Sequence, residues 1–177
     1  MRDPILVVGV GRCGTSEVCR VLESLGVDFG GRGTVRESNP NGDYEHVIIK
    51  RWDGHYLDGE IGEAEWRTAV AAEALGMSYP WGYKHPRGVS MLEVYDRMWP
   101  DAKWVWCWRD TDNVVASWSR WYDRSEKSCK NSVKRRLRKV LGFFADRSYT
   151  FIDMTDRRTG QELADILRPI VVEMEGP

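Results

Sequence analysis

The stretch Ile5-Leu-Val-Val-Gly-Val-Gly-Arg-Cys-Gly-Thr-Ser16 decides the fold of this chain. It begins as an unbroken apolar run, which is typical of a strand buried on both faces of a parallel sheet. It then passes through three glycines and ends in Thr15 and Ser16. The N–H groups of such a loop and of the helix that follows it converge on one point, where they bind a phosphate-like anion. We therefore expect a strand over Ile5–Val10, an anion-binding loop and a helix over Thr15–Leu25.

This loop departs from the phosphate loop of ATPases and GTPases in its charge. Gly9, Gly14 and Ser16 match the pattern G-x-x-x-x-G-K-S/T, but Thr15 replaces the lysine, and Arg12 is the cation of the loop. Further along, the expected strand Lys103–Trp108 is followed by Arg109, and Asp110 is only a weak candidate for a magnesium ligand. The sequence predicts a site in which two arginines bind an anion without a metal.

Strand-like and helix-like runs alternate along the rest of the chain. This alternation predicts an α/β fold with three αβα layers around a central parallel sheet, similar to the P-loop nucleotide hydrolases. A length of 177 residues fits a single domain over residues 1–177. The further expected strands are Trp81–Lys84, Lys103–Trp108 and Tyr149–Met154, and the further expected helices are Ala64–Leu75, Val89–Met98, Asp112–Trp121, Val133–Phe144 and Gln161–Val172.

Composition and charge narrow the class of partner. A net charge of -1, with 30% charged and 42% hydrophobic residues, is typical of a globular protein without general attraction to nucleic acid or to anionic membranes. The four cysteines (Cys13, Cys19, Cys107 and Cys129) form neither a CxxC pair nor a zinc-type spacing. We expect free thiols in a reducing cytoplasm, no metal, and neither a nucleic-acid nor a membrane partner.

Cys13 lies inside the anion-binding loop. We interpret it as a small residue that the loop tolerates. The alternative is a redox-sensitive thiol whose pKa the positive potential of the loop lowers.

Two further patterns have a structural and a functional interpretation. The indoles of Trp104, Trp106 and Trp108 share one face of a strand, which favours a core face over a substrate-stacking platform. Among the other tryptophans, Trp52 or Trp81 is expected to line a pocket. The basic residues after Cys129 cannot all share one face of a helix, so we interpret them as a solvated helix rather than as an anion-binding surface. They are Lys130, Lys134, Arg135, Arg136, Arg138 and Lys139.

Four segments, in the expected order, resemble the PAPS-dependent sulfotransferase family, in its short soluble bacterial and viral form. Gly11-Arg-Cys-Gly-Thr-Ser16 resembles the family's 5′-phosphosulfate loop P-K/R-S-G-T-S/T, with Cys13 in place of serine. Asn39-Pro-Asn-Gly-Asp-Tyr-Glu45 resembles N-P-x-G-Y-F-E, with Asp43 as a departure, and Lys84-His-Pro-Arg87 resembles K-D/T-P-R/H. Arg109-Asp-Thr-Asp-Asn-Val-Val-Ala-Ser117 resembles the 3′-phosphate motif R-D/N-P-x-x-x-x-x-S, with Thr111 in place of proline.

The resemblance implies transfer of a sulfuryl group from 3′-phosphoadenosine 5′-phosphosulfate (PAPS) to a hydroxyl or amine of a small-molecule or glycan acceptor. The product adenosine 3′,5′-bisphosphate (PAP) is released, and no metal is required. Arg109 and Ser117 are expected to bind the 3′-phosphate, and Arg12 and Lys84 to stabilise the charge that develops on the leaving group. The residues expected to bind the 5′-phosphosulfate are Gly11, Arg12, Cys13, Gly14, Thr15 and Ser16. A small P-loop kinase and a non-catalytic nucleotide-binding protein are the alternatives.

The catalytic base has two main candidates, Glu45 and His85, because members of the family use either a glutamate of an early loop or a histidine close to the strand-end lysine. We favour Glu45, with Glu37 as a distant third candidate. Adjacent strand residues point to opposite faces, so Lys84 and His85 both enter the site only if the strand has ended there.

Acceptor specificity is expected to lie in two loops, Gly30–Asp43 and Trp52–Glu63. Arg87 either binds an acidic acceptor or forms a surface ion pair. His46 and His55 show no ligand spacing, and we interpret them as structural or surface residues.

Overall fold

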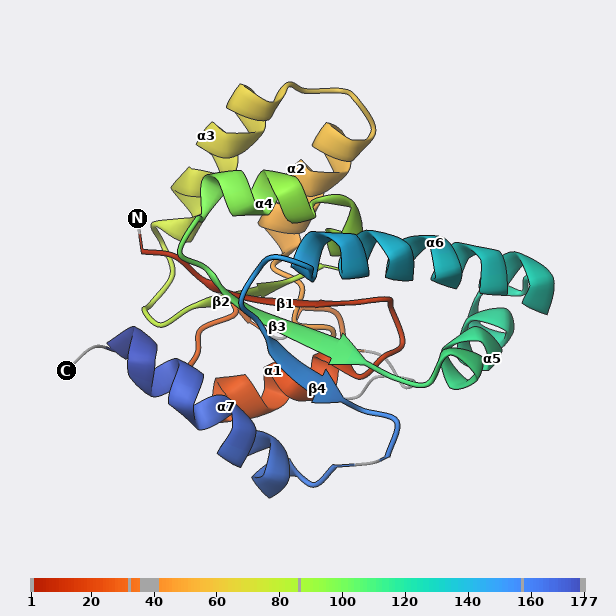
Figure 1. Cartoon of the computed structure of the whole chain (residues 1–177). Helices are drawn as coiled ribbons and strands as arrows, with labels where there is room; N and C mark the ends of the chain where they lie inside the picture. Colours follow the sequence, from red (N-terminus) through yellow and green to blue (C-terminus); the bar gives the residue numbers. More distant parts are fainter. Residues whose placement is uncertain (1, 32, 36–41, 86, 157, 176–177) are drawn as a thin grey trace.

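The computed structural model describes residues 2–31, 33–35, 42–85, 87–156 and 158–175. Within these residues a four-stranded, all-parallel sheet lies between two layers of helices (Figure 1), which confirms the expected three-layer α/β fold. The strands are β1 (Ile5–Gly9), β2 (Gly82–Lys84), β3 (Lys103–Trp108) and β4 (Thr150–Asp153), in the spatial order β2-β1-β3-β4. The helices are α1 (Thr15–Ser24), α2 (Val47–Leu57), α3 (Glu63–Ala74), the short 3₁₀-helix η1 (Gly88–Ser90), α4 (Leu92–Met98), α5 (Thr111–Tyr122), α6 (Glu126–Phe144) and α7 (Gly160–Glu175).

Strand β1 lies in the middle of the sheet and is buried along its whole length, as its unbroken apolar sequence predicts. It pairs with β2 through Ile5 and Gly82 and with β3 through Val7 and Val105. The chain therefore returns first on one side of β1 and then on the other. In α/β sheets, ligands bind beyond the carboxyl ends of the strands at such a point of reversal.

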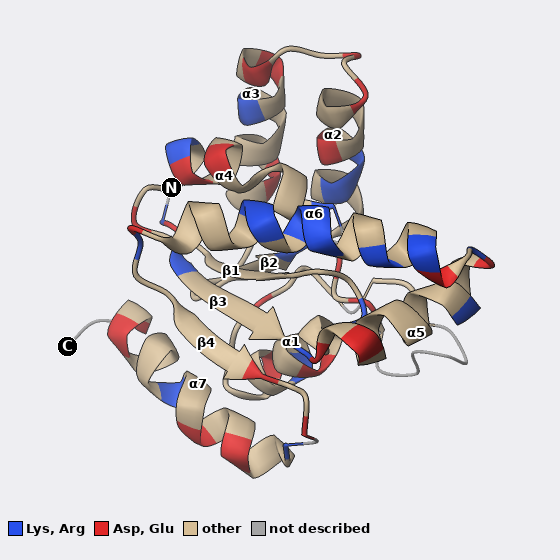
Figure 2. Ribbon diagram, turned by 45° about the vertical axis from the view of Figure 1, so that its right-hand side comes forward, with Lys and Arg blue, Asp and Glu red and all other residues tan. Residues whose placement is uncertain are grey.

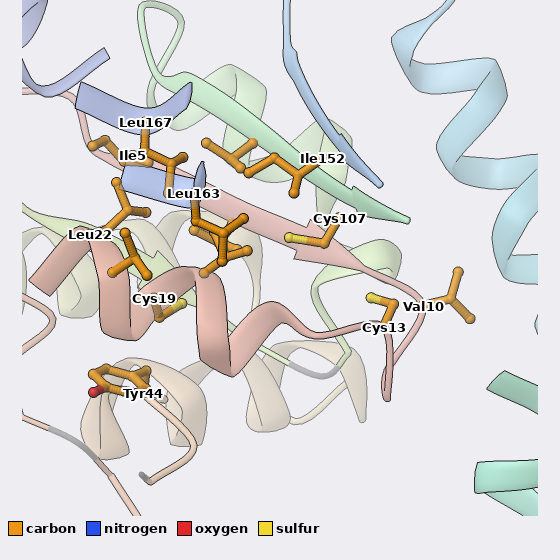
Figure 3. Close-up of a cluster of buried hydrophobic side chains, with 14 of the residues drawn as sticks. Ile5, Val10, Cys13, Cys19, Leu22, Tyr44, Cys107, Ile152, Leu163 and Leu167 are labelled. Carbon is orange, nitrogen blue, oxygen red and sulfur yellow. The ribbon is translucent and has the colours of Figure 1, made fainter. Parts of the chain in front are cut away.

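The two faces of the sheet bury chemically different cores. On one face, α1 and α7 enclose a mainly aliphatic cluster that includes Ile5, Leu22 and Leu167 (Figure 3). On the other face, α2, α3, α4 and the second half of α6 enclose a cluster rich in aromatic rings. A buried aspartate, Asp53, also lies in this second layer.

The alternating indoles of β3 belong to the aromatic core, as expected. Trp104 and Trp106 are buried, with ring centroids 5.0 Å and 5.7 Å from those of Phe143 and Phe144 respectively. The expectation that Trp52 or Trp81 lines a pocket is wrong for the cavity described below. Trp81 is buried inside the aromatic cluster, and Trp52 packs against it.

Helix α2 is the largest departure from the sequence-based expectation, since it occupies much of the expected loop Trp52–Glu63. Its first residues, Val47 and Ile48, are exposed, whereas Ile49 and Asp53 are buried. The helix thus has no continuous apolar stripe, which is the pattern that identifies amphipathic helices in a sequence. Its burial is instead determined by polar and aromatic partners from α3, α4 and β2.

Helix α6 begins at Glu126, well before the expected start at Val133. Ser125 caps it by accepting a hydrogen bond from the N–H of Ser128, and Cys129 is buried one turn before Val133. Because this first part of α6 is polar, the sequence did not predict it as helix.

The basic residues of this run lie along α6 (Figure 2), and most of them are exposed. Arg136 is partly buried, with its guanidinium carbon 4.9 Å from the ring centroid of Trp118. The interpretation as a solvated helix therefore holds for Lys130, Lys134, Arg135, Arg138 and Lys139. In the part of the chain that the structure describes, no helix has the length and apolar character needed to cross a membrane.

Candidate functional site

A cavity of about 440 Å³ opens beyond the carboxyl ends of β1, β2 and β3. It brings together the glycine-rich loop, the segment before α2, the end of β2, the end of β3 and the end of α5. The residues that line it are Gly9, Gly11, Arg12, Gly14, Thr15, Ser16, Glu17, Thr34, Asp43, Glu45, Lys50, Lys84, His85, Arg109, Trp121 and Tyr122. All of the sequence-predicted site residues are among them except Cys13 and Ser117, which lie beside the cavity in contact with its lining.

The glycine-rich loop forms one wall, and two of its glycines are required by its geometry. A Cβ on Gly9 would lie 2.3 Å from Cys13 Sγ and 2.9 Å from the carbonyl oxygen of Cys107. Gly14 caps α1 with a φ of 88°, a left-handed conformation that glycine adopts readily. No side chain caps this helix, so the N–H groups of its first turn, at Thr15 and Ser16, give the cavity a positive electrostatic potential.

Arg12 lines the cavity and is held against α5. Its φ of 68° is unusual for a residue with a side chain, and such strain is concentrated at functional sites. Its Nε donates to Ser117 Oγ at 3.1 Å, and its guanidinium carbon lies 4.8 Å from the ring centroid of Trp121. In this structure Ser117 thus contacts Arg12, whereas the sequence motif suggested a role for Ser117 beside Arg109.

Arg109 lines the cavity at the end of β3. Its Nε is buried and, within the described residues, has no hydrogen-bond partner. A buried donor without an acceptor is costly, and it is more costly on a charged group. The adjacent Asp110 has a structural role, because it caps α5 by accepting the N–H of Asn113 at 3.0 Å. An unpartnered guanidinium nitrogen at this position therefore indicates a site for an anion.

Strand β2 ends at Lys84, so both Lys84 and His85 line the cavity. From the sequence, both residues could enter the site only if the strand had ended there, and the strand does end at Lys84. Lys84 Nζ donates to Glu45 Oε1 at 3.0 Å, and both side chains are nearly buried, with 5% of each residue exposed. The ammonium of Lys50, on α2, lies 2.5 Å from Glu45 Oε2. Glu45 is thus an anion placed between two lysines.

His85 is held from behind the cavity by the fully buried Asp53. Its Nδ1 lies 3.0 Å from Asp53 Oδ2. Asp53 and Lys50 were not identified from the sequence, because α2 was not predicted. One signal was present: Asp53 follows Ile49 by one helical turn, which places a carboxylate on the buried side of the helix. Trp121 and Tyr122 were also missed as lining residues.

Cys13 is a buried neutral thiol, and the alternative in which the loop lowers its pKa is wrong. Burial raises the pKa of Cys13 to about 11, although Lys84 and Arg109 act in the opposite direction. Figure 3 shows its side chain within the same buried cluster as Cys107. All four cysteines of the chain are free and buried.

The remaining candidates lie at the surface or outside the described residues. His46 caps α2 by accepting the N–H of Ile49, and His55 pairs with Glu60, which agrees with structural and surface roles. Arg87 forms an exposed ion pair of 2.9 Å with Asp58. Glu37, residues 39–41 of the asparagine-rich motif and Pro86 lie outside the described residues. Within the described part, no cluster of three or more His, Cys, Asp or Glu side chains could hold a metal ion.

Comparisons with known proteins agree with this architecture. A family model described as a sulfotransferase domain matches residues 4–169. The crystal structure of the sulfotransferase STF1 from Mycobacterium tuberculosis H37Rv aligns with a TM-score of 0.53 at 16% sequence identity, over 95% of this chain and 67% of that one. At this identity the structural match concerns the fold. No curated protein sequence matches the chain.

Proposed function

Since the chain belongs to the sulfotransferase family, we propose that it transfers the sulfuryl group of PAPS to a hydroxyl or amine acceptor and releases PAP. The observation that carries the choice of donor is the buried, unpartnered Nε of Arg109 in the same cavity as the uncapped start of α1. PAPS has anionic groups at both ends of its ribose. A cavity with one anion site at a helix start and another at a strand-end arginine suits such a molecule.

The loop and Lys84 are proposed to hold the 5′-phosphosulfate. Thr15 and Ser16 line the cavity at the uncapped start of α1, and Lys84 also lines it. Arg109 is proposed to bind the 3′-phosphate, and its fork-shaped guanidinium suits this role. Arg12, which the contact with Ser117 holds at the edge of the loop, supplies a second guanidinium to the same cavity.

The reaction moves one sulfuryl group and one proton. The acceptor oxygen or nitrogen forms a bond to sulfur while the bond from sulfur to the bridging oxygen breaks, and the electron pair of that bond remains on the 5′-phosphate of PAP. Positive charge near the bridging oxygen lowers the barrier, and one preorganised donor of this kind contributes about 3 kcal/mol. Lys84 is the proposed donor, because its ammonium is nearly buried at the cavity wall.

The acceptor's proton is proposed to go to His85 and not to Glu45, which the sequence favoured. Both carboxylate oxygens of Glu45 are paired, Oε1 with Lys84 and Oε2 with Lys50. Protonation of Glu45 would weaken these ion pairs. His85 uses Nδ1 to contact Asp53, so Nε2 remains available to a molecule in the cavity. A positioned imidazole is well suited to general-base catalysis near neutral pH.

A small P-loop kinase is the second candidate, because nucleotide kinases share the strand, glycine loop and helix start. Two observations disfavour it. Thr15 occupies the position of the lysine that neutralises the β- and γ-phosphates, and the carboxylate of Asp110 already caps α5.

Thermal-shift titrations with PAP, ATP–Mg²⁺ and GTP–Mg²⁺ test the proposal. A ligand that binds only the folded state raises the melting temperature, so PAP is expected to give the largest shift. A larger shift with ATP–Mg²⁺ would support the kinase. Assays with PAPS and a panel of phenols, alcohols, amines and glycans then test transfer. Binding of PAP without transfer to any member of the panel would identify a nucleotide-binding protein without catalytic activity.

A further inference from the structure

Asp53 is the most completely buried charged side chain beside the site, with 0% of the residue exposed. It lies on α2 and contacts polar groups from three other elements. Its Oδ1 accepts from Trp66 Nε1 at 2.9 Å, and its Oδ2 accepts from the hydroxyl of Tyr83 at 2.6 Å. Its Oδ2 also accepts from the hydroxyl of Tyr95 and lies 3.0 Å from His85 Nδ1.

The partners of Asp53 indicate which side donates each hydrogen. An indole N–H can only donate. Burial, together with the charge of Asp53, raises the pKa of both Tyr83 and Tyr95, so these phenols keep their protons and donate them. The carboxylate of Asp53 already accepts hydrogen bonds from these three donors, and an ionised carboxylate can only accept. The contact with His85 must then be a hydrogen bond donated by Nδ1–H.

We propose that Asp53 is a positioning residue that fixes His85 as the Nδ1–H tautomer, with the lone pair of Nε2 directed to the cavity. Asp53 does not line the cavity, whereas His85 does. Of the four partners of Asp53, only His85 reaches the cavity, so the network ends in one group that can take a proton. The carboxylate also stabilises the imidazolium that forms when His85 accepts the proton, as in the Ser–His–Asp triad.

Helix α2 contacts the site through a second residue, Lys50. Lys50 lies three residues before Asp53, a spacing that brings two side chains to neighbouring positions on a helix. Lys50 pairs with Glu45, and Asp53 holds His85, so one helix orients two ionisable groups of the cavity. A core aspartate with a purely structural role would need only its tyrosine and tryptophan partners.

The tautomer can be measured without any knowledge of the acceptor. The chain has three histidines, and ¹⁵N–¹H spectra of the imidazole rings separate a nitrogen that carries hydrogen from one that does not. The His85→Asn variant identifies the signals of His85. In the wild-type protein we expect neutral His85 to carry its hydrogen on Nδ1. An Nε2–H tautomer would overturn the proposal, and this measurement requires no substitution of Asp53.

The Asp53→Asn variant tests the role of the carboxylate. We expect the Nδ1–H tautomer to be lost or mixed with the Nε2–H form, because an amide can donate as well as accept. Tyr95→Phe is the matched control, since it removes another hydrogen bond to the same Oδ2 and leaves the carboxylate in place. The control should retain the tautomer. An unchanged tautomer in folded Asp53→Asn protein, as judged by circular dichroism, would contradict the proposal.

The kinetic consequence rests on the proposed function. We expect Asp53→Asn to lower kcat about 10²- to 10⁴-fold with little change in the affinity for PAP. In a His85→Asn background, Asp53→Asn should cause little further loss, because Asp53 acts through His85; independent, multiplicative losses would overturn the proposal. If the wild type shows the Nδ1–H tautomer but transfers no sulfuryl group, the proposed function fails, while the orientation of His85 by Asp53 is supported.

Discussion

The cavity has two sides that are built in different ways. The loop side, residues 9–17, presents backbone N–H groups at the start of α1 and lies within one short segment of the chain. The network side presents the side chains of Glu45, Lys50, Lys84 and His85, with Asp53 behind His85, from three segments. The loop side depends on backbone conformation, which glycine placement specifies locally. The network side depends on long-range contacts between ionisable groups.

This difference predicts which property of the protein a substitution on each side should change. Substitutions on the loop side should change anion binding and folding, since they alter the backbone or the charge around one pocket. Substitutions on the network side should change turnover, since they alter the orientation and protonation of one imidazole. Binding, stability and turnover of matched variants therefore separate the two sides.

The largest effect is expected for His85→Asn, which should lower kcat about 10²- to 10⁴-fold, the range for loss of a general base. Glu45→Gln should lower kcat by less, because its proposed role is to hold Lys84 through the 3.0 Å ion pair. Steady-state kinetics of both variants, with PAP affinity measured in parallel, check this order. A greater loss in Glu45→Gln would make Glu45 the base.

Arg109→Ala should weaken PAP binding about 100-fold, which corresponds to roughly 3 kcal/mol for charge-assisted hydrogen bonds to a phosphate. The fold should persist, because within the described residues the Nε of Arg109 has no protein partner to lose. Isothermal titration calorimetry with PAP measures the change. Unaltered affinity would remove Arg109 from the binding site and would place the 3′-phosphate elsewhere.

Gly14→Ala should lower the free energy of unfolding by about 1–3 kcal/mol, the typical cost of an unfavourable backbone conformation. Gly14 has a φ of 88°, and a Cβ there would lie 2.9 Å from Met154 Cε. Gly142→Ala is the matched control, because Gly142 lies inside α6 and an added Cβ meets nothing within 4 Å. The control should be neutral or stabilising in urea unfolding. Equal destabilisation of both variants would show that the loop does not require glycine at this position.

The buried thiol of Cys13 should make the protein less stable at alkaline pH. Burial raises the pKa of Cys13 from 9.0 to about 11, so the unfolded chain loses this proton first. The stabilisation is complete below pH 9 and is lost as pH rises through 11, up to about 3 kcal/mol for a shift of about two units. Urea unfolding at pH 8 and pH 10.5 should show a smaller decrease for Cys13→Ala than for the wild type. Identical decreases would indicate that this thiol ionises freely in the folded protein.

The smallest effect is expected for Arg87→Ala. Arg87 and Asp58 form an exposed ion pair, and such pairs contribute little because water and salt screen them. Both the melting temperature and the affinity for PAP should remain within error of the wild-type values. A marked loss of PAP affinity would move Arg87 from the surface into the binding site.

Local patterns allowed most of the loop side to be predicted. The apolar run of β1, the glycine spacing and the start of α1 at Thr15 are all features of one short segment. Strand β3 and Arg109 were also identified from the sequence, because a strand-end residue of a parallel sheet lies at the edge where ligands bind. Helix α2 was missed because it is stabilised by buried polar partners and lacks an apolar stripe.

The sequence by itself determined the α/β class, the glycine-rich loop and the position of two arginines at the carboxyl edge of the sheet. These features follow from periodicity and from backbone requirements that act over a few residues. Only the tertiary structure decided the pairing of the ionisable groups: Glu45 with Lys84 and Lys50, and His85 with Asp53. Such pairs form between residues up to 39 positions apart, and the energy of each depends on burial and distance, which no local pattern encodes.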